Sequence, residues 1–396
     1  MNRRTRRRAL LLAAAMVIII TVSTRLKADT GTCGGASLTL PFTDVPGGSV
    51  FFCSIAEAFF SGLTNGTTPT TYDPSASVPR EQMAAFVSRT MDQSVKRAGK
   101  RAALDQFWTT QTSNNLGLTT VGNGPALIKF DGSDLWVANF PDGTVSRVKA
   151  SDGRVLETWT GATGALGVLV AMGKVFVTGQ SSPGKLYQID PTQAVTAVTT
   201  VTSSLGNTTI GIAFDGQRIW TANLGGSVSI VTLNPLSVNT VTTGFGGCTG
   251  LVFDGTNMWV TNNGDSSIKK LDSNGNIIMS VSVGGGPSHP AFDGTNIWVP
   301  NGNSNGISVV RATGGLAGTV LATLTGNGLN TPTQITFDGE RMLVTNQSSG
   351  GSVSLWNASD LTPIGTLSTG GAAFGACSDG LNFWITLAST NKIARF

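Results

Sequence analysis

The sequence has little charge: only 12% of its 396 residues are Asp, Glu, Lys or Arg, about half the usual fraction. Glycine is abundant, with 51 residues, and 40% of the chain is hydrophobic. So apolar a chain is not typical of a disordered protein, and so much glycine is not typical of a helical enzyme. The composition favours an all-β protein with many tight turns and with strands buried on both faces.

Groups for acid–base or metal chemistry are also scarce. The chain has one histidine, His289. Its glutamates are Glu57, Glu81, Glu157 and Glu340. Nucleophilic triads, phosphate-binding loops and cysteine metal motifs are absent from the sequence. We therefore predict no catalytic, cofactor-binding or metal-binding residue.

Long apolar runs are missing after residues 1–28. That segment carries seven Lys and Arg, no acid, and an apolar run of 14 residues from Ala9 to Val22. A bilayer span needs ~20 residues, so the pattern is that of a secretory signal peptide. Cleavage after Ala28 and retention as an uncleaved anchor both stay open, because Leu26 is large for the −3 position. Residues 5–10 loosely resemble a twin-arginine signal, so the export route is open too.

The formal charge of +4 belongs to this leader, since the rest of the chain has 19 basic and 22 acidic side chains. The charge of the remaining chain therefore does not favour a nucleic-acid ligand. We expect an extracytoplasmic protein without a membrane span in its mature chain. Export permits disulfides, and Cys33 and Cys53 are close enough in sequence to be candidates for one. Cys248 and Cys377 lie in distant repeats and are predicted to be buried free thiols.

A separate unit precedes the repeats, and we assign it to residues 29–95. It contains, in order, Phe42-Thr43-Asp44-Val45-Pro46, an apolar stretch with helical spacing from Ile55 to Leu63, turns at Asn65-Gly66 and Tyr72-Asp73-Pro74, and a second helix starting near Pro79. These residues resemble an S-layer homology (SLH) repeat. The resemblance implies attachment to a cell-wall polymer or the envelope, and it places the binding roles at Asp44, Arg80 and Gln82.

Two departures from the SLH pattern keep a second interpretation open. Pro79 replaces the usual Thr before the Arg, and one repeat is found where the family usually carries three, which together form the binding grooves. In the alternative, Arg80 and Glu81 are surface charges at a helix start, and the unit only packs on its neighbour. Residues 96–115, with Lys96, Arg97, Lys100 and Arg101, are assigned to a basic linker.

The remaining chain, 116–396, repeats one phrase: an apolar residue, Asp-Gly, three residues, a Trp and an Asn three positions further on. The clearest copy runs from Phe253 to Asn262. The Trp position holds Trp136, Phe176, Trp220, Trp259, Trp298, Leu343 and Trp384, at intervals of 39 to 45 residues. Seven units of this length predict a seven-bladed β-propeller with four-stranded blades, so the fold class is all-β with a small α-helical N-terminal module.

Local signals support this prediction. In the first unit, strands are expected at 126–130, 135–139, 144–149 and 155–160, with Asp-Gly turns between them. The last unit ends after its third strand, so a strand at 116–121 should complete the seventh blade from outside. The repeated phrase resembles the YVTN/NHL-like propellers, including the group related to virginiamycin B lyase. That lyase uses His and Glu around a divalent metal, a set that one histidine cannot supply.

Structural roles are expected for the repeated positions. The Trp side chains should pack between blades, and the Asp side chains should accept backbone hydrogen bonds in the hairpins. The Asn side chains either satisfy backbone groups after the second strand or ring the mouth of the central channel. These residues are Asn139, Asn223, Asn262, Asn301 and Asn346.

At the position nine residues before the Trp position, most of the seven repeats carry glycine, but three do not. This column reads Leu127, Gly167, Gly211, Gly250, His289, Gln334 and Gly375. The glycines predict close backbone approach at the start of the innermost strand. His289 and Gln334 would then place polar groups near a channel mouth, although His289 can also be an ordinary hydrogen-bonding side chain.

We therefore predict an exported, envelope-associated, monomeric binding or scaffolding protein, with a protein or glycan ligand on the propeller. A lyase or hydrolase in the channel is the alternative, and a purely structural envelope component is a third hypothesis. The structure can distinguish the binding hypothesis from the enzyme hypothesis. The enzyme hypothesis requires that three or more of His289, Gln334, the Asn residues and a carboxylate converge on the channel axis.

Overall fold

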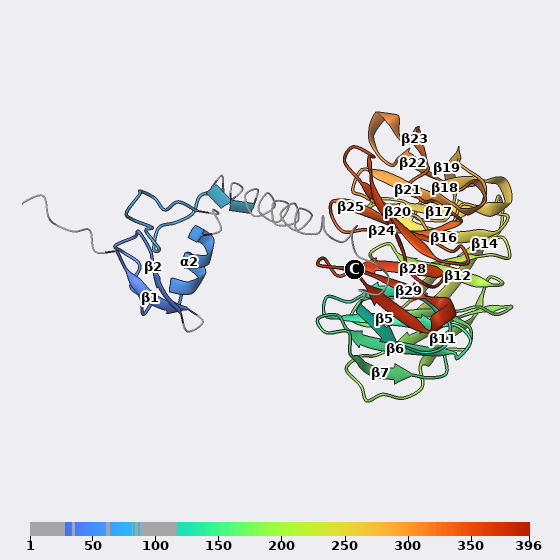
Figure 1. The fold of residues 1–396 in the computed structure, drawn as a ribbon, viewed down its shortest axis with the longest axis horizontal. Helices are drawn as coiled ribbons and strands as arrows, with labels where there is room; N and C mark the ends of the chain where they lie inside the picture. The colour runs from blue at the N-terminus through green and yellow to red at the C-terminus, as the bar shows by residue number, and fades with distance from the viewer. Residues whose placement is uncertain (1–27, 34–35, 61–63, 81, 84–85, 88–116) are drawn as a thin grey trace, which may run out of the picture. The chain divides into compact units, whose positions relative to one another are not determined.

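The computed structural model describes residues 28–33, 36–60, 64–80, 82–83, 86–87 and 117–396 (Figure 1). The chain divides into two compact units, 1–100 and 101–396. Residues 1–27 of the predicted signal peptide and the whole predicted linker, 96–115, lie outside the described residues. Among the residues that are described, no helix is long and apolar enough to cross a membrane.

The N-terminal unit is a small hairpin packed on a helix. Its elements are β1 (Thr30–Cys33), β2 (Ala36–Thr39) and α2 (Phe52–Phe60). The core contains Leu40, Phe42, Val45, Phe52, Ile55 and Ala56. The helix begins three residues before the predicted start at Ile55, because the Ser49 carbonyl and hydroxyl accept the N–H groups of Phe52 and Phe51 at 3.0 and 3.2 Å.

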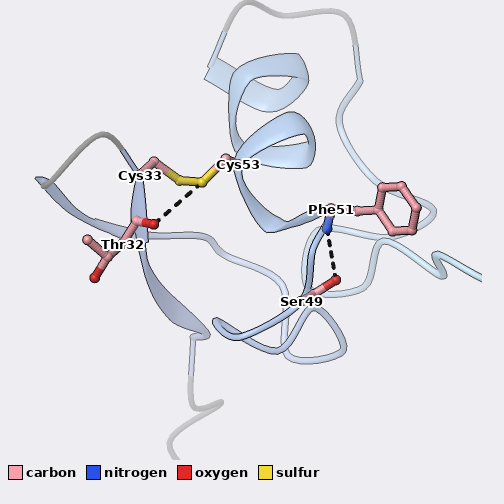
Figure 2. Close-up of a disulfide and its surroundings, with 5 residues drawn as sticks. All are labelled: Thr32, Cys33, Ser49, Phe51 and Cys53. Atoms are coloured by element: carbon pink, nitrogen blue, oxygen red, sulfur yellow. Dashed lines mark hydrogen bonds between the residues drawn. A yellow bond between two sulfur atoms is a disulfide. The ribbon is translucent and has the colours of Figure 1, made fainter.

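Cys33 and Cys53 form a disulfide that ties the end of β1 to the first turn of α2 (Figure 2). Cys248 and Cys377 are buried free cysteines, as predicted, and burial raises the pKa of each thiol to about 12. Neither thiol is therefore ionised at neutral pH.

The second unit is a ring of seven antiparallel four-stranded sheets, as predicted. Blade 1 consists of β4 (Pro125–Phe130), β5 (Asp134–Asn139), β6 (Thr144–Lys149) and β7 (Val155–Trp159). Blade 2 consists of β8 (Ala165–Ala171), β9 (Lys174–Gly179), β10 (Gly184–Ile189) and β11 (Thr199–Leu205). Blade 3 consists of β12 (Thr209–Phe214), β13 (Ile219–Asn223), β14 (Ser227–Leu233) and β15 (Leu236–Val241).

Blade 4 consists of β16 (Cys248–Phe253), β17 (Met258–Asn262), β18 (Ser267–Leu271) and β19 (Ile277–Ser282). Blade 5 consists of β20 (Ala291–Phe292), β21 (Asn296–Asn301), β22 (Gly306–Arg311) and β23 (Val320–Thr325). Blade 6 consists of β24 (Pro332–Phe337), β25 (Arg341–Asn346), β26 (Ser352–Asn357) and β27 (Pro363–Ser368). Blade 7 consists of β28 (Ala373–Ser378), β29 (Phe383–Leu387), β30 (Lys392–Arg395) and β3 (Gly117–Thr120). Short 3-10 turns connect some of these strands: η3 (Asn263–Asp265), η4 (Gly302–Ser304), η5 (Gly314–Leu316) and η6 (Ala388–Thr390).

Blade 7 contains both ends of the propeller sequence, which confirms the predicted closure. Strand β3 pairs antiparallel with β30, with Leu118 opposite Ala394. The Thr119 hydroxyl also donates to the Gly153 carbonyl of blade 1 at 2.7 Å. The innermost strands β4, β8, β12, β16, β20, β24 and β28 each contact the next, and β28 contacts β4. The inner strands thus surround one central axis.

The repeated phrase forms the turn between the first two strands of a blade and the contact of that blade with the next one. In blade 1, Asp131 Oδ1 accepts the N–H groups of Ser133 and Asp134 at 2.8 and 2.7 Å. Asp131 Oδ2 accepts the indole N–H of Trp136 at 2.7 Å. The buried Trp136 ring packs against blade 2 residues such as Val177. The backbone bonds and the interblade packing confirm the predicted roles, whereas the Trp–Asp bond was not predicted.

The same Asp–Trp bond recurs in blades 3, 4, 5 and 7. Blade 6 has Leu343 at the Trp position, and there Arg341 Nε donates to Asp338 Oδ2 at 2.8 Å instead. Blade 2 has Phe176 at the Trp position and lacks the Asp as well, since its turn holds Met172. The Asp acceptor is therefore present in the six blades that offer it a side-chain donor, and it is absent from blade 2.

The glycine column lies where inner strands approach each other, as predicted. A Cβ on Gly250 would lie 2.7 Å from His289 Cα and 2.6 Å from Pro290 Cδ of the next blade. A Cβ on Gly375 would lie 2.3 Å from the Ala126 carbonyl oxygen of blade 1. Larger side chains at these positions would push neighbouring blades apart.

Candidate functional site

The axis of the propeller carries one charged side chain. Lys129 is the sole Asp, Glu, Lys or Arg in the seven inner strands. It lies opposite Trp136 in the β4–β5 pairing. Its ammonium has no hydrogen-bond or ion-pair partner in the part of the chain that the structure describes.

The surroundings of Lys129 combine solvent exposure with many nearby protein atoms. Its side chain is exposed, yet desolvation lowers its pKa, with the neighbouring Cys377 acting in the opposite direction. Lys129 belongs to β4, the innermost strand of blade 1, so its backbone lies beside the propeller axis.

His289 lies in an irregular inner segment of blade 5. Pro290 has no N–H to donate to a strand ladder, and β20 is reduced to two residues. The His289 N–H instead donates to the Thr333 carbonyl of blade 6 at 3.0 Å, and the His289 carbonyl accepts the Ile335 N–H at 3.2 Å. This parallel bridge holds the His289 backbone against β24.

The His289 imidazole is 8% exposed. Its Nδ1 lies 3.1 Å from the Ser288 hydroxyl, and its ring lies edge-on to Phe374 with the ring centres 6.0 Å apart. Nε2 is buried and has no hydrogen-bond partner among the described residues. Burial lowers the pKa of His289 to about 4, and the charge of Lys129 adds to this effect. The imidazole is therefore neutral at pH 7.

The backbone of Gln334 forms the β-bridge with His289, but its side chain makes a separate contact. Its Oε1 accepts the backbone N–H of Ala376 at 2.9 Å, and its side chain is buried. The amide thus joins the inner strands of blades 6 and 7.

The Asn column is held within the blades. Asn139, Asn223 and Asn346 donate to Ser146, Ser229 and Ser354 at 3.0, 3.0 and 2.9 Å, so each amide ties the second strand to the third. The amide of Asn301 lies 3.0 Å from Ser308 in the same way. Asn262 Nδ2 donates to Asp265 at 2.6 Å. The structure therefore brings His289 and Gln334 together and places the Asn amides in the sheets.

Metal ligands do not gather in the described residues, which contain no group of three or more His, Cys, Asp or Glu side chains that could hold an ion. Sequence reasoning singled out His289 and missed Lys129. A usable signal existed, because Lys129 is the one charged residue in the seven expected innermost strands.

The N-terminal unit has a groove of about 530 Å³. It is lined by Thr64, Asn65, Gly66, Thr67, Tyr72, Asp73, Pro74, Ala76, Ser77, Val78, Gln82 and Phe86. Of the predicted envelope-binding residues, Gln82 lines the groove. Arg80 is exposed and is the first residue in helical conformation after Pro79.

Asp44 supports this groove from beside it. Its carboxylate accepts the N–H groups of Tyr72 and Asp73 at 2.9 and 2.7 Å. Desolvation raises the pKa of Asp44, but these backbone bonds outweigh it and the pKa is lowered. Asp44 thus positions the loop that carries Tyr72.

No protein-family model matches the sequence, and no curated protein matches it either. Solved structures match the propeller. A streptogramin B lyase structure has a TM-score of 0.58 at 16% identity, covering 72% of this chain and 98% of that one. Hydrazine synthase from Kuenenia stuttgartiensis has a TM-score of 0.58 at 17% identity, covering 70% and 97%. The WD40 propeller domain of Doa1 has a TM-score of 0.60 at 14% identity, covering 71% and 95%. At these identities the likeness establishes the propeller fold alone.

Proposed function

We propose that this chain is an exported binding or scaffolding protein that attaches to the cell envelope through an SLH-like N-terminal unit and presents its propeller to a protein or glycan. The observation that carries the proposal is the N-terminal groove and its lining. Tyr72 offers a face on which a sugar ring can stack, and Gln82 and Asn65 offer amides for sugar hydroxyls.

Charge and covalent structure support the same role. Arg80 is exposed two residues before Gln82, where it can meet an anionic group of a wall polymer. The disulfide between Cys33 and Cys53 fits an oxidising compartment outside the cytoplasm. The signal-like segment 1–28 supplies the export route.

A channel lyase or hydrolase has less support. Gln334 and the Asn side chains make hydrogen bonds that hold the blades together, so they are not free to act on a substrate. The rigid ring with its many loops is suited to presenting a binding surface.

The test is co-sedimentation of the mature protein with isolated envelope fractions. We expect the parent chain to be retained, and we expect Tyr72→Ala, Gln82→Ala and a chain lacking residues 29–110 to lose most of that retention. Val50→Ser is the matched control, because Val50 is 88% exposed and does not line the groove. Retention of the truncated chain equal to that of the parent would refute the anchoring role.

A further inference from the structure

A cavity of about 130 Å³ lies between blades 3 and 4 of the propeller. It is formed by the turn after β12 in blade 3 and by the turns after β16 and β18 in blade 4. We propose that this interblade cavity binds the acetamido group of an N-acetylated sugar. The proposal rests on the proposed function, because it names a glycan ligand and its site on the propeller.

The interblade cavity exists because Arg218 stays on its own blade, where its Cζ lies 5.4 Å from the centre of the Trp220 ring. Between blades 6 and 7, the equivalent Arg341 leans across, and its Cζ lies 5.2 Å from the centre of the Phe383 ring. Met258 is the blade 4 counterpart of Phe383, four residues after the Asp of the repeated phrase. A Met side chain therefore leaves open a space that an aromatic ring would occupy.

The charges around the cavity disfavour an anionic ligand. Arg218 Nε and Nη2 donate to Asp215 Oδ2 at 3.0 and 2.8 Å, so these two charges balance. Asp272 adds one negative charge, and its Oδ1 already accepts the N–H groups of Asn274 and Asn276, both at 2.9 Å. An anion would be repelled by Asp272, whereas a neutral group needs no counter-charge.

The walls match the two ends of an acetamido group. Trp220 and Met258 are each 1% exposed and Phe253 is half-buried, so these side chains offer an apolar surface to the methyl group. Arg218 Nη1 has no acceptor among the described residues and can donate to the acetamido carbonyl. An acetamido group is smaller than benzene, which fits a cavity of about 150 Å³, so the space is sufficient.

Uncharged polar side chains surround the opening. Gln217, Thr256 and Ser273 are exposed, and their side chains make no hydrogen bond within the part of the chain that the structure describes. Amide and hydroxyl groups of this kind bind sugar hydroxyls. A protein ligand would be favoured by a cluster of pockets for large aromatic or Arg side chains. One small cavity with a polar rim fits a sugar better.

The test is titration of the mature protein, N-terminal unit included, with N,N′-diacetylchitobiose, followed by saturation-transfer nuclear magnetic resonance and calorimetry. We expect saturable binding, with the strongest transfer to the acetamido methyl groups. Cellobiose lacks these groups and should bind at least about tenfold more weakly. The soluble disaccharide requires no envelope, so failure of this test leaves attachment through the N-terminal groove standing, and the reverse also holds.

Variants locate the response, because the N-terminal groove is also proposed to bind a glycan. Met258→Phe fills the interblade cavity and should weaken chitobiose binding by about tenfold or more, whereas the volume-conserving Met258→Leu should bind like the parent. Gln217→Ala should weaken binding by about fivefold, the worth of one hydrogen bond. Its control is Thr295→Ala, at the same turn position in blade 5. Thermal unfolding shows whether each variant is folded.

Four outcomes would overturn the proposal. They are no saturable response of the parent to chitobiose, parent-like affinity in folded Met258→Phe, equal or tighter binding of cellobiose, and tighter binding of the deacetylated disaccharide, which would show that Asp272 selects a cation. An envelope protein captured by the parent but not by Met258→Phe, without any response to chitobiose, would replace the sugar by a protein ligand.

Discussion

Replacing Asp254 by Asn tests how much the Asp of the repeated phrase contributes to the stability of the propeller. The Asp254 side chain is fully buried and accepts four donors. Oδ1 accepts the N–H groups of Thr256 and Asn257 at 2.8 and 2.6 Å. Oδ2 accepts the indole N–H of Trp259 at 2.8 Å and lies 3.1 Å from the Lys270 ammonium. Asn keeps the shape and the Oδ1 acceptor but turns an amide N–H₂ toward two other donors.

The magnitude follows from what the substitution leaves unpaired. Removing one partner of a buried ion pair costs about 3–5 kcal/mol. Lys270 also donates to the Ala312 carbonyl at 3.0 Å, which favours the lower end of that range. Leaving the indole N–H of Trp259 without an acceptor adds about 1 kcal/mol or more to the loss of stability. We expect a loss of about 4 kcal/mol, which corresponds to a drop in Tm of roughly 8 °C at about 2 °C per kcal/mol.

The assay is thermal and urea unfolding followed by tryptophan fluorescence. Asp272→Asn is the control, because Asp272 also accepts turn N–H groups but is only half-buried, and it should leave Tm nearly unchanged. In a Trp259→Phe background, Asp254→Asn should cost measurably less, since the indole donor is gone. A Tm for Asp254→Asn equal to that of Asp272→Asn would refute the reasoning, as would equal costs in both backgrounds.

The pH dependence has a definite sign. Desolvation raises the pKa of Asp254, but hydrogen bonds from Trp259, Asn257, Thr256 and Lys270 outweigh it, so the folded pKa lies below 3.8. The unfolded chain therefore takes up this proton first as pH falls. The stability that the carboxylate contributes is present above pH 3.8 and is lost as pH falls through the folded pKa. Parent and Asp254→Asn should accordingly converge in strongly acidic solution.

Three further perturbations test the ring. Gly250→Ala should cost about 1–3 kcal/mol by calorimetry, because its Cβ would meet Pro290 Cδ at 2.6 Å, whereas Gly350→Ala, which meets nothing within 4 Å, should be nearly neutral. A chain starting at residue 122 lacks β3 and should lose about 3 kcal/mol and aggregate by light scattering, unlike a chain starting at residue 117. The pKa of His289 is about 4, below its ordinary 6.5, so the unfolded state binds this proton first and stability falls from pH 6.5 toward 4. His289→Gln should remove a pH-dependent loss of roughly 3 kcal/mol over that window, and an unchanged pH profile would contradict the assignment.

The sequence by itself determined the number of blades, the strands of each and the way the ring closes. These features depend on short-range signals: Asp-Gly turns, alternating strands and a Trp at a fixed distance from each turn. In blades 1, 3, 4, 5 and 7 the Asp bonds groups two, three and five residues further along the chain, as Asp131 does with Ser133, Asp134 and Trp136. Such contacts repeat with the sequence and can be read from it.

Only the tertiary structure decided what lies at the axis and in the groove. Lys129, His289 and Phe374 come from blades 1, 5 and 7, and no local pattern relates them. The Asn residues looked equally suited to a channel mouth, but the register of β5 with β6 turns Asn139 toward Ser146. Ring closure sets which side chains from distant strands share one enclosed space. Periodicity indicates the face on which a side chain lies but not the partner it meets there, so the sequence marked Lys129 as unusual without showing its surroundings.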